Sequence, residues 1–226
     1  MESDLLKELE RKSLTSNMLL DRVAKDSSLL PEVIMGISSP EAAVRYGCAK
    51  VIMRLSEEQP ENVYGYMDFM INLLSSKHRI LTWNAIITIA NLARVDKEKR
   101  IDMILTKYFD LINNEYMVTV ANVVGNAWKI ALAKPYLADR IAAELLKTED
   151  ISTSAHLTEE CKRVITEKAI TSLDQFFDLI EDKQKVILFV RSKVKSSRRT
   201  LREKAIRFLQ KRDRQPSSYG LKENQP

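Results

Sequence analysis

Apolar residues recur at helical spacing along most of this 226-residue chain. Intervals of three and four residues place them on one face of an α-helix. The same stripe occurs in at least three segments: Val44, Cys48, Ile52 and Leu55; Leu81, Ala85, Ile89 and Leu92; and Leu201, Ala205, Phe208 and Leu209. The sequence therefore predicts a series of similar amphipathic helices. The small second residue of each stripe lets a neighbouring helix approach closely.

Helix-start signals precede these stripes at regular intervals. Ser39, Ser76 and Asn114 are 37 and 38 residues apart, and Ser196 or Ser197 follows after about two more such intervals. Ser and Asn favour helix starts because their side chains accept hydrogen bonds from free backbone N–H groups. An insertion over residues 147–158, where the apolar pattern breaks, explains the extra length of the last interval.

A shorter helical segment precedes each of these helices. A few polar residues join the two, as in antiparallel helix hairpins. The shorter segments cover residues 29–36, 61–74, 97–112, 135–146 and 183–194. We predict a repeat domain over residues 27–212, preceded by N-terminal capping helices in residues 1–26. The segment 213–226, with its Pro and Ser residues, is predicted to be disordered.

An arginine follows the first stripe residue in two of the repeats, as Val44-Arg45 and Leu201-Arg202. The period near 37 and the pattern hydrophobic-Arg-x-x-small resemble the HEAT repeat family. Leu81-Thr82 and Thr119-Val120 lack the arginine, so both a HEAT and an armadillo subtype stay open. The resemblance implies an all-α fold, a right-handed HEAT/armadillo-like α-solenoid of about five helix pairs with an N-terminal helical cap.

Composition places the chain among soluble folded proteins. It is 45% hydrophobic and 30% charged, with only 5 Gly and 6 Pro. No N-terminal stretch reads as a signal peptide, and no apolar run is long enough for a membrane span. We therefore expect a cytoplasmic protein. Cys48 and Cys161 lie in apolar helical patterns and are interpreted as small buried hydrophobic residues rather than metal ligands.

A polar stripe provides the first candidate site. Its members, at matching places in successive repeats, are Arg54; Asn84, Thr88 and Asn91; and Asn122, Asn126 and Lys129. Stacked repeats would place these side chains next to one another. One interpretation is a groove that hydrogen-bonds an extended segment of a protein partner. The other is a structural ladder in which the side-chain amides form hydrogen bonds with one another and with the backbone of the loops. The two are compatible.

Aromatic residues lie near this stripe. Trp83 and Trp128 occupy neighbouring repeats, and Tyr46 matches Trp83 one repeat earlier. They either line a groove as binding anchors or fill the core between helix pairs. His78 and His156 are interpreted as surface histidines without a role.

The C-terminal end is strongly basic, although the whole chain has a net charge of only +5. Residues 183–214 contain thirteen Lys or Arg and two acids, a net charge of +11. Since residues 215–226 are neutral, residues 1–182 carry −6. A patch of Arg198, Arg199, Arg202, Arg207, Lys211 and Arg214 offers contacts to nucleic-acid phosphates. Its alternative interpretation is the solvated outer face of a terminal repeat.

No catalytic motif accompanies these features. Phosphate-binding glycine loops, H-E-x-x-H, G-x-S-x-G and paired cysteines are all absent, and we expect no cofactor or metal. The resemblance admits one enzyme class, the alkylpurine DNA glycosylases with HEAT-like helices, but the acidic middle of this chain matches them poorly. We predict a non-enzymatic scaffold or adaptor that binds a protein partner. Nucleic-acid binding through the basic C-terminal repeat is the alternative, and a glycosylase is a distant third.

Overall fold

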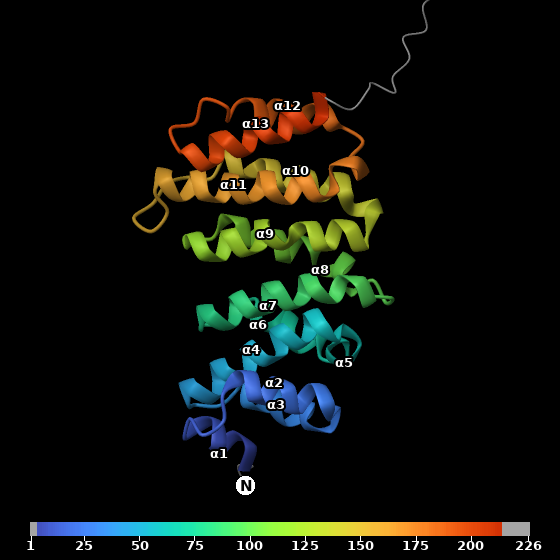
Figure 1. Ribbon diagram of the computed structural model, residues 1–226, viewed down its shortest axis with the longest axis vertical. Helices are drawn as coiled ribbons and strands as arrows, with labels where there is room; N and C mark the ends of the chain where they lie inside the picture. Colours follow the sequence, from blue (N-terminus) through green and yellow to red (C-terminus); the bar gives the residue numbers. More distant parts are fainter. Residues whose placement is uncertain (1–3, 214–226) are drawn as a thin grey trace, which may run out of the picture.

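The computed structural model describes residues 4–213, which form a column of stacked helices with no strand in that range (Figure 1). Thirteen α-helices occur among these residues: α1 (Asp4–Glu10), α2 (Ser16–Lys25), α3 (Leu30–Gly36), α4 (Ala42–Glu58), α5 (Pro60–Tyr64), α6 (Met67–Leu73), α7 (Arg79–Leu92), α8 (Arg100–Asp110), α9 (Met117–Ala133), α10 (Ala138–Leu146), α11 (Glu159–Phe176), α12 (Lys183–Arg191) and α13 (Arg199–Asp213).

Five long helices, α4, α7, α9, α11 and α13, pack side by side in chain order and run in the same direction (Figure 1). The shorter helices α3, α6, α10 and α12 each pack against the long helix that follows them. The 3₁₀ turn η3 (Leu111–Asn113), which continues α8, packs against α9. Each unit therefore contacts its neighbours in the chain, as in a solenoid. The predicted all-α stack of helix pairs is confirmed.

The predicted stripes form the core of the stack. Val44, Cys48, Ile52 and Leu55 have no exposed surface, and Ala85, Ile89 and Leu92 of the next repeat are equally buried. Leu201, Ala205 and Phe208 are buried in α13. Burial of apolar surface on this scale is the main force that holds neighbouring repeats together.

The predicted short segments are found with small differences. The segment predicted over 61–74 is split into α5 and α6, with Gly65 and Tyr66 between them. Residues 1–26 contain the two expected helices, and both α1 and α2 pack on α4, as an N-terminal cap requires. At the other end α13 continues to Asp213, the first residue of the predicted disordered tail. Residues 214–226 lie outside the described residues.

The repeated Ser and Asn residues stand three residues before their helices rather than at the N-cap. Ser39, Ser76, Asn114 and Ser196 each accept a hydrogen bond from the backbone N–H two residues later, at 3.0–3.3 Å. The long helices then begin at Ala42, Arg79, Met117 and Arg199. These side chains therefore close the turn between the two helices of a repeat. The prediction that they cap the helices directly is wrong by two residues, since the N-caps are Glu41, His78 and Tyr116 in the first three repeats.

The arginine of the repeat pattern holds this same turn. Arg45 Nη1 donates to the carbonyls of Ser39 at 2.8 Å and Pro40 at 2.9 Å. Arg202 Nη1 donates to the carbonyl of Ser196 at 2.8 Å. In the second repeat Thr82 stands at the equivalent position, and its hydroxyl lies 3.5 Å from the carbonyl of Ser76. The missing arginine is thus replaced by a shorter donor to the same turn.

The predicted insertion lies between α10 and α11. A 3₁₀ turn, η5 (Lys147–Glu149), is followed by a loop that ends at Thr158, whose side chain caps α11 by accepting from the N–H of Cys161. The loop folds back on the third repeat, where the His156 ring stacks on Tyr116 with centroids 5.3 Å apart. His156 therefore has a structural contact that its sequence context did not indicate. None of the helices in residues 4–213 has the length and apolar character needed to cross a membrane.

Candidate partner-binding groove

The outward side of the long helices carries the predicted polar stripe. Helical register places Lys50 of α4, Ile87 of α7, Gly125 of α9 and Lys168 of α11 along it, each at least partly open to solvent. Lys50, Ile87 and Gly125 are 37 and 38 residues apart, one repeat each. We call this outward stripe of α4, α7, α9 and α11 the groove face.

One pair of the predicted ladder is directly bonded. Lys129 Nζ donates to Asn91 Oδ1 at 2.6 Å, and the two residues are 38 positions apart. Asn91 in turn donates to Ser56 Oγ of α4 at 3.0 Å. Lys129 also lies 3.7 Å from a carboxylate oxygen of Glu57. The stripe therefore links three successive repeats, and at Asn91 the structural-ladder interpretation holds because this amide is buried among its partners.

Two asparagines of the stripe, Asn84 and Asn126, bond within their own helices, whereas Arg54 of α4 bonds to α2. Asn84 Nδ2 donates to the carbonyl of Ile80 at 2.9 Å, and Asn126 Nδ2 donates to the carbonyl of Asn122 at 2.8 Å. Arg54 donates to Asn17 Oδ1 at 2.8 Å. Asn84, Asn122 and Asn126 are partly exposed, whereas Thr88 is only 1% exposed. The prediction that Thr88 contacts a partner is therefore wrong, because its side chain is inside the stack.

A hollow of about 330 Å³ lies on the groove face between α7 and α9. Its floor is mainly apolar and its rim is polar. The lining residues are Glu57, Ala90, Asn91, Arg94, Trp128, Lys129, Leu132 and Ala133. Leu132 is 45% exposed there, which is unusual for a leucine in the middle of a repeat stack. An apolar floor with a few polar groups around it is typical of a binding site.

Sequence reasoning found Asn91, Trp128 and Lys129 of this hollow but not Glu57, Arg94 or Leu132. The available signal was that α9 is apolar almost all round, which places some apolar residues on its outer face. Trp128 is partly exposed and lines the hollow, as the anchor interpretation requires. Trp83 instead donates its indole N–H to Thr119 Oγ1 at 3.0 Å, a bond between repeats.

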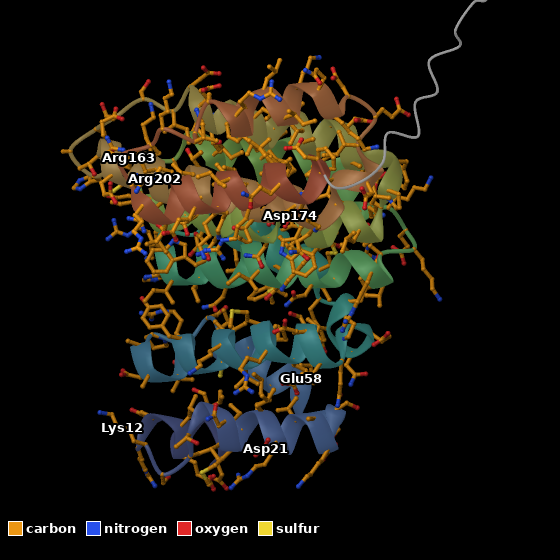
Figure 2. All side chains as sticks on the ribbon, turned by 45° about the horizontal axis from the view of Figure 1, so that its top comes forward. Lys12, Asp21, Glu58, Arg163, Asp174 and Arg202 are labelled. Carbon is orange, nitrogen blue, oxygen red and sulfur yellow. The ribbon has the colours of Figure 1, made fainter. Side chains whose placement is uncertain are left out.

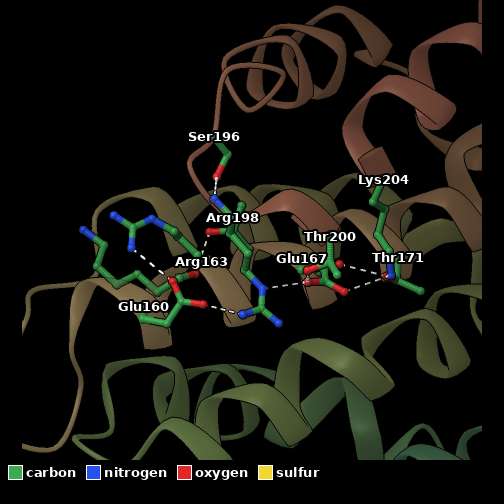
Figure 3. A network of polar contacts seen from close by, with 10 residues as sticks. Glu160, Arg163, Glu167, Thr171, Ser196, Arg198, Thr200 and Lys204 are labelled. Atoms are coloured by element: carbon green, nitrogen blue, oxygen red, sulfur yellow. Dashed lines mark hydrogen bonds and ion pairs between the residues drawn. The ribbon is translucent and has the colours of Figure 1, made fainter. Parts of the chain in front are cut away.

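The basic C-terminal patch is largely paired with acids of α11. Glu160, Glu167 and Asp174 follow one another at seven-residue intervals on the side of α11 that faces α13. Arg198 bonds to both Glu160 and Glu167, Lys204 lies 3.6 Å from Glu167, and Asp174 pairs with Lys211 and Arg212. We call this row of ion pairs between α11 and α13 the ionic ladder. Figure 3 shows the part of it that runs from Glu160 to Lys204.

The ladder favours the ionised forms of Glu160 and Glu167. A hydrogen bond from Arg198 lowers the pKa of Glu160. Burial raises the pKa of Glu167, but hydrogen bonds from Thr200 and Arg198 outweigh it, so that this pKa too lies below its ordinary value. The ladder thus attaches α13 to α11 by charge as well as by packing.

The predicted anion-binding residues consequently do not form one continuous patch of unpaired charges. Arg198 and Lys211 belong to the ladder, and Arg202 holds the turn at Ser196. Figure 2 labels Arg202 near the start of α13 and Arg163 near the start of α11, with Asp174 farther along α11. Arg199 and Arg207 have side chains 81% and 78% exposed, and both pair with Glu203 one turn away. Arg214 lies outside the described residues.

Reactive groups are scarce in the described part of the chain. No group of three or more His, Cys, Asp or Glu side chains is placed to hold a metal ion in residues 4–213. Cys48 is fully buried, and burial, with a smaller contribution from Glu32, raises the pKa of its thiol to about 12. Such a thiol stays protonated and unreactive. Cys161 is only partly buried, so the prediction of a buried residue is wrong there.

Comparison with known proteins agrees with the fold. No protein-family model matches this sequence, and a search of curated proteins finds no match. Among solved structures, a designed armadillo repeat protein in complex with the peptide (KR)4 superposes with a TM-score of 0.56 at 15% identity, over 91% of this chain and 90% of that one. A second designed armadillo repeat protein gives 0.52 at 16% identity over 91% and 90%, and an engineered protein gives 0.51 at 14% over 91% and 86%. The chain therefore has a HEAT/armadillo-like α-solenoid fold.

Proposed function

We propose that this chain is a non-enzymatic scaffold that binds an extended segment of a partner protein along the groove face. The observation that carries the proposal is the hollow between α7 and α9, where Leu132 and Trp128 are open to solvent inside a rim formed by Glu57, Asn91, Arg94 and Lys129. The designed armadillo repeat protein of similar fold, which was solved in complex with a peptide, supports the same use of a solenoid.

Selection from a display library of random ten-residue peptides tests this proposal. The bait is the full chain, compared with the variant Leu132→Glu, which places a charge in the hollow. Leu188→Glu provides a matched control, because Leu188 is 53% exposed on α12, away from the groove face. We expect the selected peptides to bind the wild type and Leu188→Glu equally and to lose at least tenfold in affinity for Leu132→Glu. Equal binding to all three proteins, or no selected peptide, contradicts the proposal.

A further inference from the structure

The two helices in the middle of the groove face, α7 and α9, contain no acidic residue of their own, and the nearest carboxylate is Glu57 of α4, which lies 3.7 Å from Lys129 at the rim of the hollow. Arg79 and Lys129 are the only charged residues of α7 and α9, respectively. Apolar side chains take their place: Ile80, Val118 and Leu132 are 40–45% exposed on these two helices. A partner segment with basic side chains would find no carboxylate on α7 or α9 to compensate for the loss of its hydration.

The helices on either side contribute positive charge. Lys50 of α4 and Lys168 of α11 are exposed, and neither forms an ion pair within residues 4–213. Three acids of the same two helices are already paired: Glu57 lies 3.7 Å from Lys129, Glu58 lies 3.6 Å from Arg54, and Glu167 belongs to the ladder with α13. Exposed lysines without an ion pair within residues 4–213 therefore flank α7 and α9 on both sides, at Lys50 and Lys168.

Gly125 lies at this centre, inside α9, and has no packing role within the stack. A Cβ added there would contact only Cδ of Lys168, at 3.8 Å. By contrast, a Cβ on Gly36 would lie 2.5 Å from Cys48 Sγ, and one on Gly47 would lie 2.8 Å from a methyl group of Leu9. A glycine inside a helix lowers stability relative to alanine. What Gly125 provides in return is open space for the close approach of another backbone.

We infer that the partner segment carries a short apolar run with acidic residues on both sides, and that its backbone crosses α9 at Gly125. The apolar run covers Ile80, Val118 and Leu132, and the acidic residues reach Lys50 and Lys168. This inference rests on the proposed function and adds to it the chemistry of the partner. Charge complementarity of this kind contributes mostly to specificity and to the rate of association.

The composition of the selected peptides tests the inference. From the display library we expect peptides with Asp or Glu near both ends and apolar residues between them, and we expect the peptide (KR)4 not to compete with them. Affinity should fall by about tenfold for the double variant Lys50→Glu, Lys168→Glu at low salt, and the difference should shrink near 1 M salt. The control variant Lys97→Glu reverses one lysine charge on the exposed loop before α8 and should not change the affinity.

Gly125 is tested separately from the charges. Gly125→Ala is expected to raise the melting temperature by roughly 2–4 °C, because alanine favours the helix. The same variant should bind the selected peptides with an affinity several-fold lower. Gly125→Leu should abolish their binding while the protein stays folded. A structural role for Gly125 would instead lower stability. Selected peptides rich in Lys or Arg, or binding unchanged in Gly125→Leu, would overturn the inference and leave the scaffold proposal standing. No selected peptide at all would overturn both.

Discussion

The ammonium of Lys134 lies 3.0 Å from a carboxylate oxygen of Asp96, and the two side chains are only 5% and 0% exposed. The residues are 38 positions apart, one repeat, at the ends of consecutive long-helix segments. Lys134 also donates to the backbone carbonyl of Asp96 at 3.2 Å. Asp96 accepts further hydrogen bonds from the Tyr64 hydroxyl and from the N–H groups of Arg100 and Ile101. One buried carboxylate thus joins two consecutive repeats on the side where the long helices end.

Replacing Lys134 by methionine should destabilise the stack. The change leaves Asp96 buried without its counter-charge, which costs about 3 kcal/mol of unfolding free energy. Urea unfolding monitored by circular dichroism measures the loss. Lys185→Met is the control, because Lys185 pairs with Asp182 at the surface, where an ion pair contributes little. Equal unfolding midpoints for Lys134→Met and the wild type would contradict this role.

The pair of Asp96 and Lys134 should make the free energy of unfolding fall at both low and high pH. We call these two ranges the acid limb and the alkaline limb. Burial raises the pKa of Asp96, but hydrogen bonds from Tyr64, Lys134 and two backbone N–H groups outweigh it and lower that pKa. Its contribution is therefore present above the ordinary value of about 3.9 and is lost as the pH falls through the lowered pKa.

The alkaline limb belongs to Lys134. Burial lowers its pKa, but hydrogen bonds to Asp96, Asp102 and Tyr136 raise it overall. This stabilisation is full below about pH 10.4 and is lost as the pH rises through the raised pKa. Unfolding measured from about pH 2 to about pH 12 should show both limbs in the wild type. In Lys134→Met the acid limb should shrink and the contribution of Lys134 to the alkaline limb should vanish.

Because the ionic ladder joins α11 to α13 by charge, the local stability of the C-terminal repeat should depend on the salt concentration. Glu167→Gln removes the carboxylate that Arg198, Thr200 and Lys204 share. Amide hydrogen exchange in α13 should accelerate several-fold in this variant and, in the wild type, on transfer to 1 M salt, while exchange in α7 and α9 stays unchanged. Glu203→Gln is the matched control, since within residues 4–213 Glu203 pairs only with Arg199 and Arg207 of its own helix. Equal acceleration in both variants would contradict the ladder's role in attaching α13.

The same ladder predicts weak binding to nucleic acid. Arg199 and Arg207 are the most exposed arginines of the predicted patch within the described residues. We expect duplex DNA to bind weakly at 50 mM salt, with a salt dependence that corresponds to about two or three phosphate contacts. Fluorescence anisotropy across a salt series measures this slope. A slope equivalent to six or more contacts would favour the nucleic-acid alternative and would require the ladder to open.

The architecture could be predicted from the sequence because it depends on local patterns. The stripe from Val44 to Leu55 and its copies specify which helix faces are buried, and a repeat of about 37 residues specifies that the helices stack. Asn91 and Lys129 were predicted to lie side by side for the same reason, since residues one repeat apart meet in a solenoid. Helix starts were misplaced by two residues because a Ser or Asn that closes a turn and one that caps a helix look alike in sequence.

The local pattern of residues specifies the order of the repeats, their core and the basic composition of the C-terminal end. Which polar groups already have partners depends instead on the packing of the whole stack. The local pattern did not determine that Glu160, Glu167 and Asp174 lie against that basic end, or that Arg202 is used on a turn. Nor did it show that Thr88 is buried while Leu132 is exposed. Charge pairing and exposure depend on distances between helices far apart in the chain, so they follow from the packing of the whole stack and not from the local pattern.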